Sequence, residues 1–457
     1  MVFRDGVPGY YDRLGYLFLD FNAFFASVEQ ADNPSLCGRP VMVTPLESDH
    51  TGAIAASYEA RPYGIKRGTT VREARRLCPD IVIIAARHDR YVAIHQDIKE
   101  TIEEVLPIHT VYSVDEVACS LSPSEGEPEA ALRTARAVKA ALHQRFGPAL
   151  RSSIGLAQTR LLGKLAAESR KPDGLTVFLP TDLPQRLSGM ALHDIPGIGN
   201  GMLARLENVE VRTCEQLWTL SPKQMRKIWN SVEGERFWYA LHGYETDEPR
   251  SKPKKSMIGH SRVLGKDHET PEGARIVARA LVLKAAARLR HYGYRTRNVS
   301  LYSQLRKREG QLEAMEGSTS LEATADSFAI LEAFDHLWTH HLEEIRRRTG
   351  VQSLRFGKVA IYLSHLTALG SVEERQTELF AGAGDLATTR NRERLWKMID
   401  ALNADEDGKI AGLGKGKERG PAIGRYVTLA AQLNLDLNYL GGKIAFSRVP
   451  DQAEFVM

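Results

Sequence analysis

The sequence predicts a multidomain protein in which an α/β domain is followed by a short helical unit and a smaller α+β domain. Its 457 residues exceed one ordinary core and suggest about three domains at roughly 150 residues each. Over the first 180 residues, short apolar runs alternate with helical patterns, which is typical of an α/β domain. Between residues 257 and 366 the order becomes strand, helix, two strands, helix, strand, which indicates an α+β domain.

Each element of the first region follows from its apolar pattern. Short runs of large apolar residues predict strands, and apolar residues at helical spacing predict helices. Residues 181–245 are helical and are interrupted by "IPGIGNG", whose proline and glycines predict a turn. The expected strands are 16–20, 40–45 and 81–86, and the expected helices are 57–64 and 90–106.

The second region begins after a linker. Residues 246–256 combine prolines with mixed charge and few apolar side chains, which is typical of a linker. The run 298–307 alternates like an edge strand. Beyond residue 366, "GKIAGLGKGKERG" is a glycine- and lysine-rich stretch of low complexity. The other expected elements are strands at 256–264 and 353–366 and helices at 271–294 and 327–348.

Composition excludes several classes of protein. No apolar stretch approaches the ~20 residues that cross a bilayer, and the N-terminus lacks the basic-then-apolar layout of a signal peptide. The four cysteines lie far apart without a CxxC pair, which argues against a zinc knuckle or a disulfide framework. We therefore expect a cytoplasmic protein without a membrane partner, and we expect it to be a monomer.

Positive charge is concentrated in one part of a nearly balanced chain. The net charge is +4, but residues 251–308 hold fifteen Lys and Arg against three acids. Such a local excess favours a surface that meets a polyanion such as nucleic acid. A solvated helix face is the structural alternative, since positive stretches are common.

Carboxylates occupy two places where apolar residues would be expected. Asp20 ends the strand "YLFLD", and Asp115 and Glu116 interrupt the β-like stretch "VYSVDEVACSL". Adjacent like charges between buried strands repel each other strongly in a low dielectric. Three carboxylates on neighbouring strands could hold two Mg²⁺ or Mn²⁺ ions, which commonly serve displacement at phosphorus. Salt bridges from Arg or Lys are the structural alternative.

Four blocks together carry a family resemblance. "DFNAFFASVE", "SYEARPYGIKRG", "YSVDE" and "ESRKPDG" occur in this order, and the chain from about Tyr16 to Leu366 resembles a Y-family translesion DNA polymerase of the DinB and UmuC kind. The resemblance implies a right-hand polymerase with palm, small fingers, helical thumb and an α+β little-finger domain. The implied boundaries are palm 1–23 and 90–180, fingers 24–89, thumb 181–245, linker 246–256, little finger 257–366 and C-terminal tail 367–457.

The resemblance also assigns the catalytic residues. It implies that Asp20, Asp115 and Glu116 hold the metal ions in the palm, and that the carbonyl of Phe21 is a further ligand. Phe25 matches the steric gate, the ring that lies beneath C2′ of the incoming sugar and excludes a 2′-hydroxyl.

Other residues are implied to contact the nucleotide. Tyr58 and Arg61, three residues apart, would share a face of a helix or turn and converge on a triphosphate. Lys171 in "RKPDG" matches the family's third phosphate contact. Ala55 replaces a hydroxyl that some relatives carry, so one phosphate hydrogen bond is expected to be missing. Phe24 is assigned to the nucleotide site as well, with plain packing of helix against sheet as its structural alternative.

The resemblance places DNA contacts in two regions. "LHDIPGIGNGMLARLE" resembles the helix-hairpin-helix of the family's thumb, where Gly197 and Gly199 would let backbone N–H groups approach a phosphate. Such turns are also ordinary helix connectors. The basic region falls on the linker and the first half of the little finger, where contacts to the duplex backbone are expected. The residues expected there are Lys254, Lys255, Arg262, Arg295 and Arg297.

"RQTELFAG" in the tail matches a bacterial sliding-clamp-binding pentapeptide through Gln376, Leu379 and Phe380. Such a peptide docks in extended form into a preformed pocket. A chance match is the alternative, because five-residue patterns recur by chance. The 77 residues that follow Phe380 give a layout similar to that of UmuC.

Together these features imply a template-directed DNA polymerase of the translesion type, which is damage-tolerant and of low fidelity. It would add dNTPs to a primer 3′-hydroxyl by two-metal phosphoryl transfer, with primer–template DNA, dNTP and the sliding clamp as partners. A non-catalytic, clamp-docked scaffold is one alternative, but it predicts lost metal ligands and all three acids are present. A palm-containing cyclase is another, but the hairpin, basic linker and little finger would have no purpose there.

Overall fold

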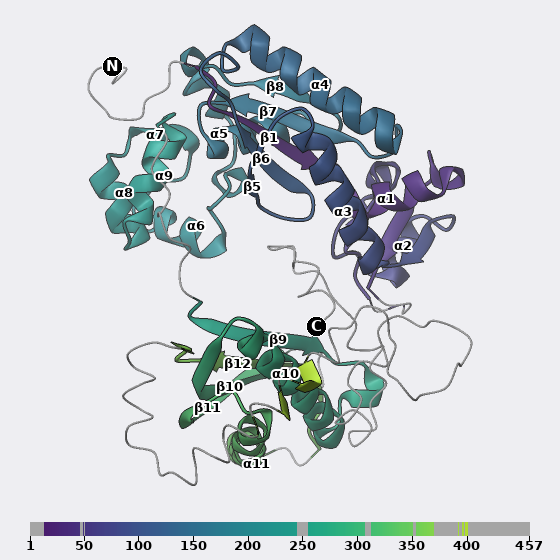
Figure 1. Cartoon of the computed structure of the whole chain (residues 1–457), viewed down its shortest axis with the longest axis vertical. Coiled ribbons are helices and arrows are strands. Elements are labelled where there is room, and N and C mark those ends of the chain that lie inside the picture. The colour runs from purple at the N-terminus through teal and green to yellow at the C-terminus, as the bar shows by residue number, and fades with distance from the viewer. Residues whose placement is uncertain are drawn as a thin grey trace. The chain divides into compact units, whose positions relative to one another are not determined.

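The structure, a computed structural model, describes residues 13–45, 49, 51–244, 255–306, 312–350, 353–369, 392, 395–396 and 398–400. These residues fall into two compact units, 13–244 and 255–400. The expected combination of α/β, helical and α+β regions is confirmed, because the first unit contains two sheets and a helical region and the second a sheet with two long helices (Figure 1). No described helix combines the length and the apolar character that a bilayer crossing requires.

A five-stranded sheet forms the centre of the first unit, in the order β5-β6-β1-β7-β8. β1 lies in the middle, pairs antiparallel with β6 and β7, and is buried along its whole length. This burial explains its unbroken apolar run, since a strand covered on both faces needs no polar alternation. The strands are β1 (Tyr16–Phe21), β5 (Ile108–Val111), β6 (Glu116–Ser120), β7 (Ser152–Ala157) and β8 (Leu175–Val177), and the accompanying helices are α3 (His88–Glu103), α4 (Pro128–Phe146) and α5 (Arg160–Ser169).

Helix α5 lies very close to β1 and β7. A Cβ on Gly155 of β7 would lie 2.0 Å from the carbonyl oxygen of Gly163, so a larger residue at this position would force the helix away. Phe18 of β1 packs with Ala167 of α5. Because the side chains of a strand alternate in direction, Asp20 lies on the same side of β1 as Phe18, which is the side that α5 covers.

The chain between β1 and α3 forms a small three-stranded sheet in the order β3-β2-β4. β2 pairs parallel with β4 and antiparallel with β3. The helix expected at 57–64 is a 3₁₀ helix over Tyr58–Tyr63, because Pro62 within it has no N–H for a regular α-helical turn. The other elements are α1 (Phe24–Asp32), β2 (Val41–Thr44), β3 (Ala55–Ala56), α2 (Val71–Leu77) and β4 (Val82–Ala85), with a short 3₁₀ helix at Pro34–Leu36.

Short helices complete the first unit. They share one apolar cluster, which includes Leu217 and Trp238 and also Leu165 of α5, so the helical region is fixed to the central sheet. Ser221 and Gln224 form a capping box that explains where α8 begins. The helices are α6 (Asn200–Glu207), α7 (Cys214–Thr219), α8 (Pro222–Trp229) and α9 (Glu233–Leu241), preceded by 3₁₀ helices at Pro180–Asp182, Gln185–Leu187 and Leu192–Asp194.

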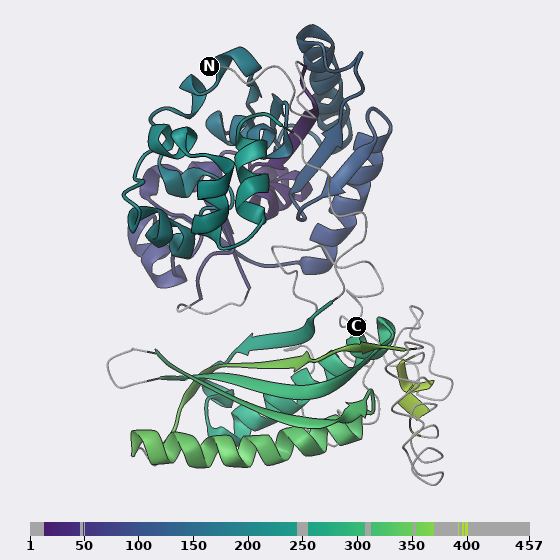
Figure 2. The same ribbon diagram turned by 90° about the vertical axis from the view of Figure 1, so that its left-hand side faces the viewer.

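The second unit is an antiparallel sheet in the order β11-β10-β12-β9, with α10 and α11 on one of its faces (Figure 2). The edge position expected for 298–307 is wrong, since β10 lies between β11 and β12. One face of β10 packs against the helices, and a central antiparallel strand buried on one face alternates as an edge strand does. The elements are β9 (Met257–Val263), α10 (Pro271–His291), β10 (Tyr294–Arg306), β11 (Leu312–Thr324), α11 (Ser327–Thr349), β12 (Phe356–Ser364) and β13 (Thr367–Ala368), with a 3₁₀ helix at Lys266–His268.

Residues beyond the expected end of this domain also belong to its core. Trp396 is only 3% exposed, and its Nε1–H donates to Oδ1 of Asp326 over 2.7 Å. Arg290 donates to both carboxylate oxygens of Asp400, at 2.6 and 2.8 Å. The described part of 392–400 therefore packs on the α+β domain, where the sequence indicated only a tail.

Candidate active site

Asp20 and Glu116 lie directly opposite each other on neighbouring strands. Asp20 of β1 pairs with Glu116, the first residue of β6. Opposed residues on adjacent antiparallel strands share one face of the sheet, with Cβ atoms about 5 Å apart. The register thus brings together two acids that are 96 positions apart in the sequence.

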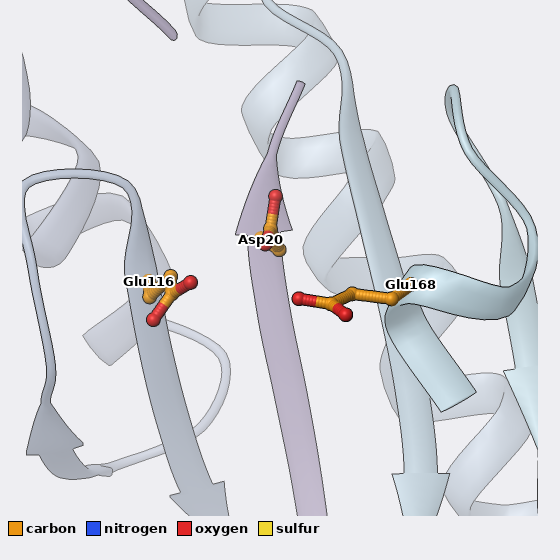
Figure 3. A group of neighbouring side chains, drawn as sticks. All are labelled: Asp20, Glu116 and Glu168. Atoms are coloured by element: carbon orange, nitrogen blue, oxygen red, sulfur yellow. The ribbon is translucent and has the colours of Figure 1, made fainter. Parts of the chain in front are cut away.

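Helix α5 adds a third acid to this pair. Carboxylate oxygens of Asp20, Glu116 and Glu168 all lie within 4.8 Å of one another (Figure 3). Glu168 comes from the end of α5, and its side chain points toward the end of β1 (Figure 3). Oxygen atoms at this spacing can be bridged by one divalent cation, whose bonds to oxygen are about 2.0–2.6 Å long.

Asp115 lies in the turn that leads into β6, close to the other acids. Its backbone carbonyl accepts a hydrogen bond from the N–H of Phe21 over 2.9 Å, which joins the turn to the end of β1. Its carboxylate accepts from the hydroxyl of Ser113. Its negative charge raises the pKa of Asp20. Asp115 therefore joins Asp20, Glu116 and Glu168 as a fourth acid at this end of the sheet.

Burial makes ionisation of these acids costly. It raises the pKa of Asp20 to about 6, even though the charge of Lys171 lowers it. Burial also raises the pKa of Asp115. It raises the pKa of Glu168 as well, against the opposing charges of Lys171 and Lys164. A divalent cation would remove part of this cost, because carboxylates bind it in their ionised form.

Two lysines lie among the acids and form the ion pairs that the sequence left open as an alternative. Lys171 Nζ lies 2.7 Å from Oδ2 of Asp20, and Lys164 Nζ donates to Oε1 of Glu116 over 2.7 Å. Two ammonium groups balance only two of the four carboxylates. The ionised site therefore retains negative charge, which fits a divalent cation better than it fits a closed network of salt bridges.

A buried hydrogen-bond network holds the turn that carries Lys171. Oδ1 of Asn22 accepts from the backbone N–H of Asp173 over 2.7 Å, and Nδ2 of Asn22 donates to the hydroxyl of Ser153 over 3.1 Å. Asn22 directly follows β1. The network therefore fixes the turn beside the strand end that carries Asp20.

A cavity of about 630 Å³ opens beside the acids, and Phe25, Arg61 and Asp115 are among the residues that line it. Cavities of roughly 300–1,000 Å³ suit small organic ligands. The ring of Phe25 lies 4.5 Å, centroid to centroid, from the ring of Tyr91. Tyr91 is fully buried, and its hydroxyl donates to Oε1 of Glu29 over 2.7 Å. Phe25 thus has a fixed support that keeps its ring at the cavity wall.

The 3₁₀ helix brings Tyr58 and Arg61 into contact. The guanidinium of Arg61 lies 3.6 Å from the centroid of the Tyr58 ring. The hydroxyl of Tyr58 is buried and finds no hydrogen-bond partner in the part of the chain that the structure describes, which marks it as a group that a ligand could satisfy. Phe24 and Ala55 line the same cavity, and Phe24 also packs against Phe21, so it serves both as a wall and in packing.

The two glycines expected at DNA lie at the turn before α6. Gly197 has a φ of +96°, a conformation that favours glycine. A Cβ on Gly199 would meet no atom within 4 Å, so the space beside this residue is open.

The basic residues expected at DNA lie in different environments. Arg297 is exposed on β10, and Arg295 is partly buried. Arg262 is only 6% exposed, and its charge acts on Lys284 of α10, so its burial argues against direct contact with a polyanion. Lys255 Nζ lies 3.7 Å from the centroid of a tyrosine ring. Lys254, Gln376, Leu379 and Phe380 lie outside the described residues.

The sequence pattern alone indicates no role for Lys164, Glu168 or Asn22. Asn22 and Glu168 both lie in blocks that carry the family resemblance, "DFNAFFASVE" and "ESRKPDG". Lys164 and Glu168 are four residues apart on a helix, a spacing that usually marks a solvated ion pair. The available signal was their place just before the phosphate-contact turn.

Sequence comparison with known proteins agrees with this geometry. The impB/mucB/samB family matches residues 19–168, the C-terminal domain of that family matches 255–379, and the DNA polymerase-iota thumb domain matches 193–245. DNA polymerase IV of Moorella thermoacetica is 36% identical over 289 residues, which are 62% of this chain and 72% of the relative. DNA polymerase IV of Alkalilimnicola ehrlichii is 32% identical over 284 residues, which are 62% of this chain and 79% of the relative.

Structural comparison supports the same fold. The solved Y-family DNA polymerase chimera Dbh-Dpo4(243-245)-Dbh matches with a TM-score of 0.63 and 20% sequence identity, over 78% of this chain and 99% of that chain. The family match from residue 19 to 168 spans Asp20, Asp115, Glu116 and Glu168. From these matches the chain belongs to the impB/mucB/samB family, and it is a Y-family DNA polymerase of the DinB and UmuC kind.

Proposed function

We propose that this chain is a template-directed translesion polymerase that adds dNTPs to a primer 3′-hydroxyl with the help of two divalent cations. The observation that carries the proposal is the meeting of Asp20, Asp115 and Glu116 beside a cavity that Phe25 and Arg61 line. Clusters of carboxylates alone occur in sites that catalyse many different reactions. Acids next to an aromatic ring and a guanidinium suit a nucleoside triphosphate, which has both a sugar and phosphates to recognise.

The acids fit Mg²⁺, with Mn²⁺ as a substitute. Asp20, Asp115, Glu116 and the carbonyl of Phe21 would supply hard oxygen ligands, and Glu168 offers a further oxygen close by. The acidic cluster found among the described residues contains neither cysteine nor histidine, which disfavours zinc and copper. Bound divalent cations would neutralise charge that develops on the reacting phosphate.

Other residues of the chain would bind and orient the nucleotide. Arg61 and Lys171 supply positive charge for the triphosphate, and the hydroxyl of Tyr58 can donate a hydrogen bond to it. The ring of Phe25, supported by Tyr91, would meet a 2′-hydroxyl, so deoxynucleotides are preferred. Positioning and electrostatics supply most of the catalysis in phosphoryl transfer.

In this proposal the chain is a right hand with the domain boundaries that the resemblance implies. The central sheet is the palm, and the small sheet belongs to the fingers, 24–89. A fingers domain of this size checks the nascent base pair weakly, which permits damaged templates at a cost in accuracy. The helical region is the thumb, 181–245, and the second unit contains the little finger, 257–366.

Primer–template DNA would be held through its backbone. The turn at Gly197 and Gly199 would present N–H groups to a phosphate, and exposed Arg297 would supply charge from β10. Lys254, Lys255 and Arg295 belong to the same basic region and remain part of the proposal. Arg262 is left out because it is buried.

We also propose that Gln376, Leu379 and Phe380 bind a bacterial sliding clamp. The support is the match of "QTELF" to the clamp-binding pentapeptide and its place after the little finger.

Primer extension with Mg²⁺ tests the proposed function. We expect the full chain to extend a primed template, and we expect Asp20→Asn and Glu116→Gln to lower kcat/KM at least about a thousand-fold, equivalent to ~4 kcal/mol. Glu103→Gln, which changes an exposed acid of α3, is the matched control and should extend normally. A pure protein that binds primed DNA and never extends it would instead favour the non-catalytic scaffold.

A further inference from the structure

Lys164 is a cation inside the acidic site that the proposed reaction does not use. Its ammonium donates to Oε1 of Glu116 over 2.7 Å, and the charges of Glu168 and Asp20 also act on it. Burial lowers the pKa of Lys164, but these three acids raise it more, so the side chain remains charged. The site therefore contains a fixed positive charge among its acids.

The packing of α5 explains why Lys164 reaches this place. The close approach of α5 to β7 at Gly155 brings the helix over the face of the sheet that carries Asp20. Lys164 and Glu168 are one helical turn apart, so they share the face of α5 that meets the strand end. Lys164 passes the ring of Phe18, with Nζ 5.9 Å from the ring centroid.

The pair between Lys164 and Glu116 differs from an ordinary surface ion pair. The two side chains are 24% and 21% exposed, so water screens them only in part. Glu116 is also one of the acids whose oxygens gather within 4.8 Å. An ammonium on Glu116 and a divalent cation among the same oxygens would repel each other, so the two cations compete for one place.

We infer that Lys164 takes the place of a divalent cation in the metal-free protein: it holds Glu116 near Glu168 and Asp20, and it releases Glu116 when the cation binds. The inference rests on the proposed function, because it takes these acids to be a cation site. Lys164 is a positioning residue, since it touches Glu116 and no reacting atom.

The stability and the cation response of metal-free protein test this inference. Lys164→Met removes the charge and keeps an unbranched side chain. Arg90→Met is the control, because Arg90 lies 2.7 Å from Oδ1 of Asp32, a carboxylate that is 22% exposed, in the same unit and outside the acidic site. Lys164→Arg keeps the charge and should behave like the wild type. The full chain of each protein is dialysed against EDTA, and its Tm is measured before and after addition of Mg²⁺.

We expect Lys164→Met to lower the Tm of the metal-free protein by about 2–5 °C, because three acids lose their counter-charge. Mg²⁺ should restore this loss, so the Mg²⁺-induced rise in Tm should be larger than that of the wild type. Arg90→Met should lower the Tm by a smaller amount, and its rise with Mg²⁺ should equal that of the wild type. Mn²⁺ binding, measured by electron paramagnetic resonance, should be about ten-fold tighter in Lys164→Met, since an ammonium about 5 Å from a divalent cation repels it even in a water-like dielectric.

Three results would overturn the inference: an equal Mg²⁺ response in Lys164→Met and the wild type, weaker Mn²⁺ binding by Lys164→Met, or failure of Lys164→Met to fold with Mg²⁺ present. Each would mean that Lys164 only forms a structural ion pair with Glu116, or that it stabilises the site when the divalent cation is bound. A wild-type protein that shows no Mg²⁺ response and extends no primer would refute the proposed function as well. If the wild type responds and extends while Lys164→Met responds no more strongly, only the role of Lys164 is refuted.

Discussion

The buried imidazole of His95 should make the stability of the first unit depend on pH. It is a buried residue of α3, and its Nδ1–H donates to the carbonyl of Val114 over 2.9 Å. Burial lowers the pKa of His95 from 6.5 to about 4, while the Val114 carbonyl opposes this and the charge of Lys99 adds to it. Val114 precedes Asp115, so His95 also supports the turn that carries a proposed metal ligand.

The sign and the size of the effect follow from proton linkage. Below pH 6.5 the unfolded chain takes up a proton at this ring, whereas the folded protein does so only near pH 4, so acidification favours unfolding. Between pH 7.5 and 4.5 the free energy of unfolding should fall by about 2.5 kcal/mol through this one ring. The loss should level off below about pH 4.

Urea unfolding of the full chain between pH 7.5 and 4.5 measures this loss. His95→Gln is the matched variant, because the amide keeps a donor for Val114 and does not titrate. Hydrogen exchange of amides in α3 and β6 separates the first unit from the second, where burial also lowers the pKa of His341 to about 4. The wild type should lose about 2.5 kcal/mol more than His95→Gln on acidification. The same dependence on pH in both proteins would mean that His95 does not cause the loss.

Three further substitutions give separate tests. Phe25→Ala should improve ribonucleotide insertion relative to deoxynucleotide insertion at least about a hundred-fold, or ~2.7 kcal/mol, because the ring that Tyr91 supports no longer blocks a 2′-hydroxyl. Single-nucleotide insertion kinetics measure this ratio, and an unchanged ratio would mean that Phe25 is not the steric gate. Trp396→Ala should lower the free energy of unfolding of the second unit by about 3–5 kcal/mol. Urea unfolding, followed by hydrogen exchange of amides in α11, measures this change. A change below about 1 kcal/mol would mean that the indole adds little to the core. Leu379→Ala with Phe380→Ala should abolish stimulation by the clamp in extension assays while sparing distributive synthesis; an equal loss of both would mean that the segment is structural.

The positions of Asp20 and Glu116 could be predicted from the sequence because both interrupt strongly apolar strands. A buried strand tolerates a carboxylate only where a partner of positive charge meets it, so the two acids mark strand ends that share a site. Most of the expected strands and helices are present in the structure, because the spacing of apolar residues determines which face of each element is buried.

Lys164, Glu168 and Trp396 could not be placed in this way. A lysine and a glutamate four residues apart on a helix are usually solvated, and only the tight approach of α5 at Gly155 turns them toward the acids. Trp396 is buried against residues far away in the chain, and its indole donates to Asp326, which is 70 positions away. Contacts of this range depend on tertiary packing, which no local pattern records.

In the proposed function, Asp20, Asp115 and Glu116 bind divalent cations next to the incoming nucleotide. Anomalous diffraction from crystals grown with Mn²⁺, primed DNA and a dNTP would locate these cations. We expect Mn²⁺ peaks in contact with all three carboxylates, and we expect weaker peaks in Asp20→Asn. A site without Mn²⁺, with Lys164 and Lys171 still paired to Glu116 and Asp20 while the nucleotide is bound, would mean that these acids do not form a cation site.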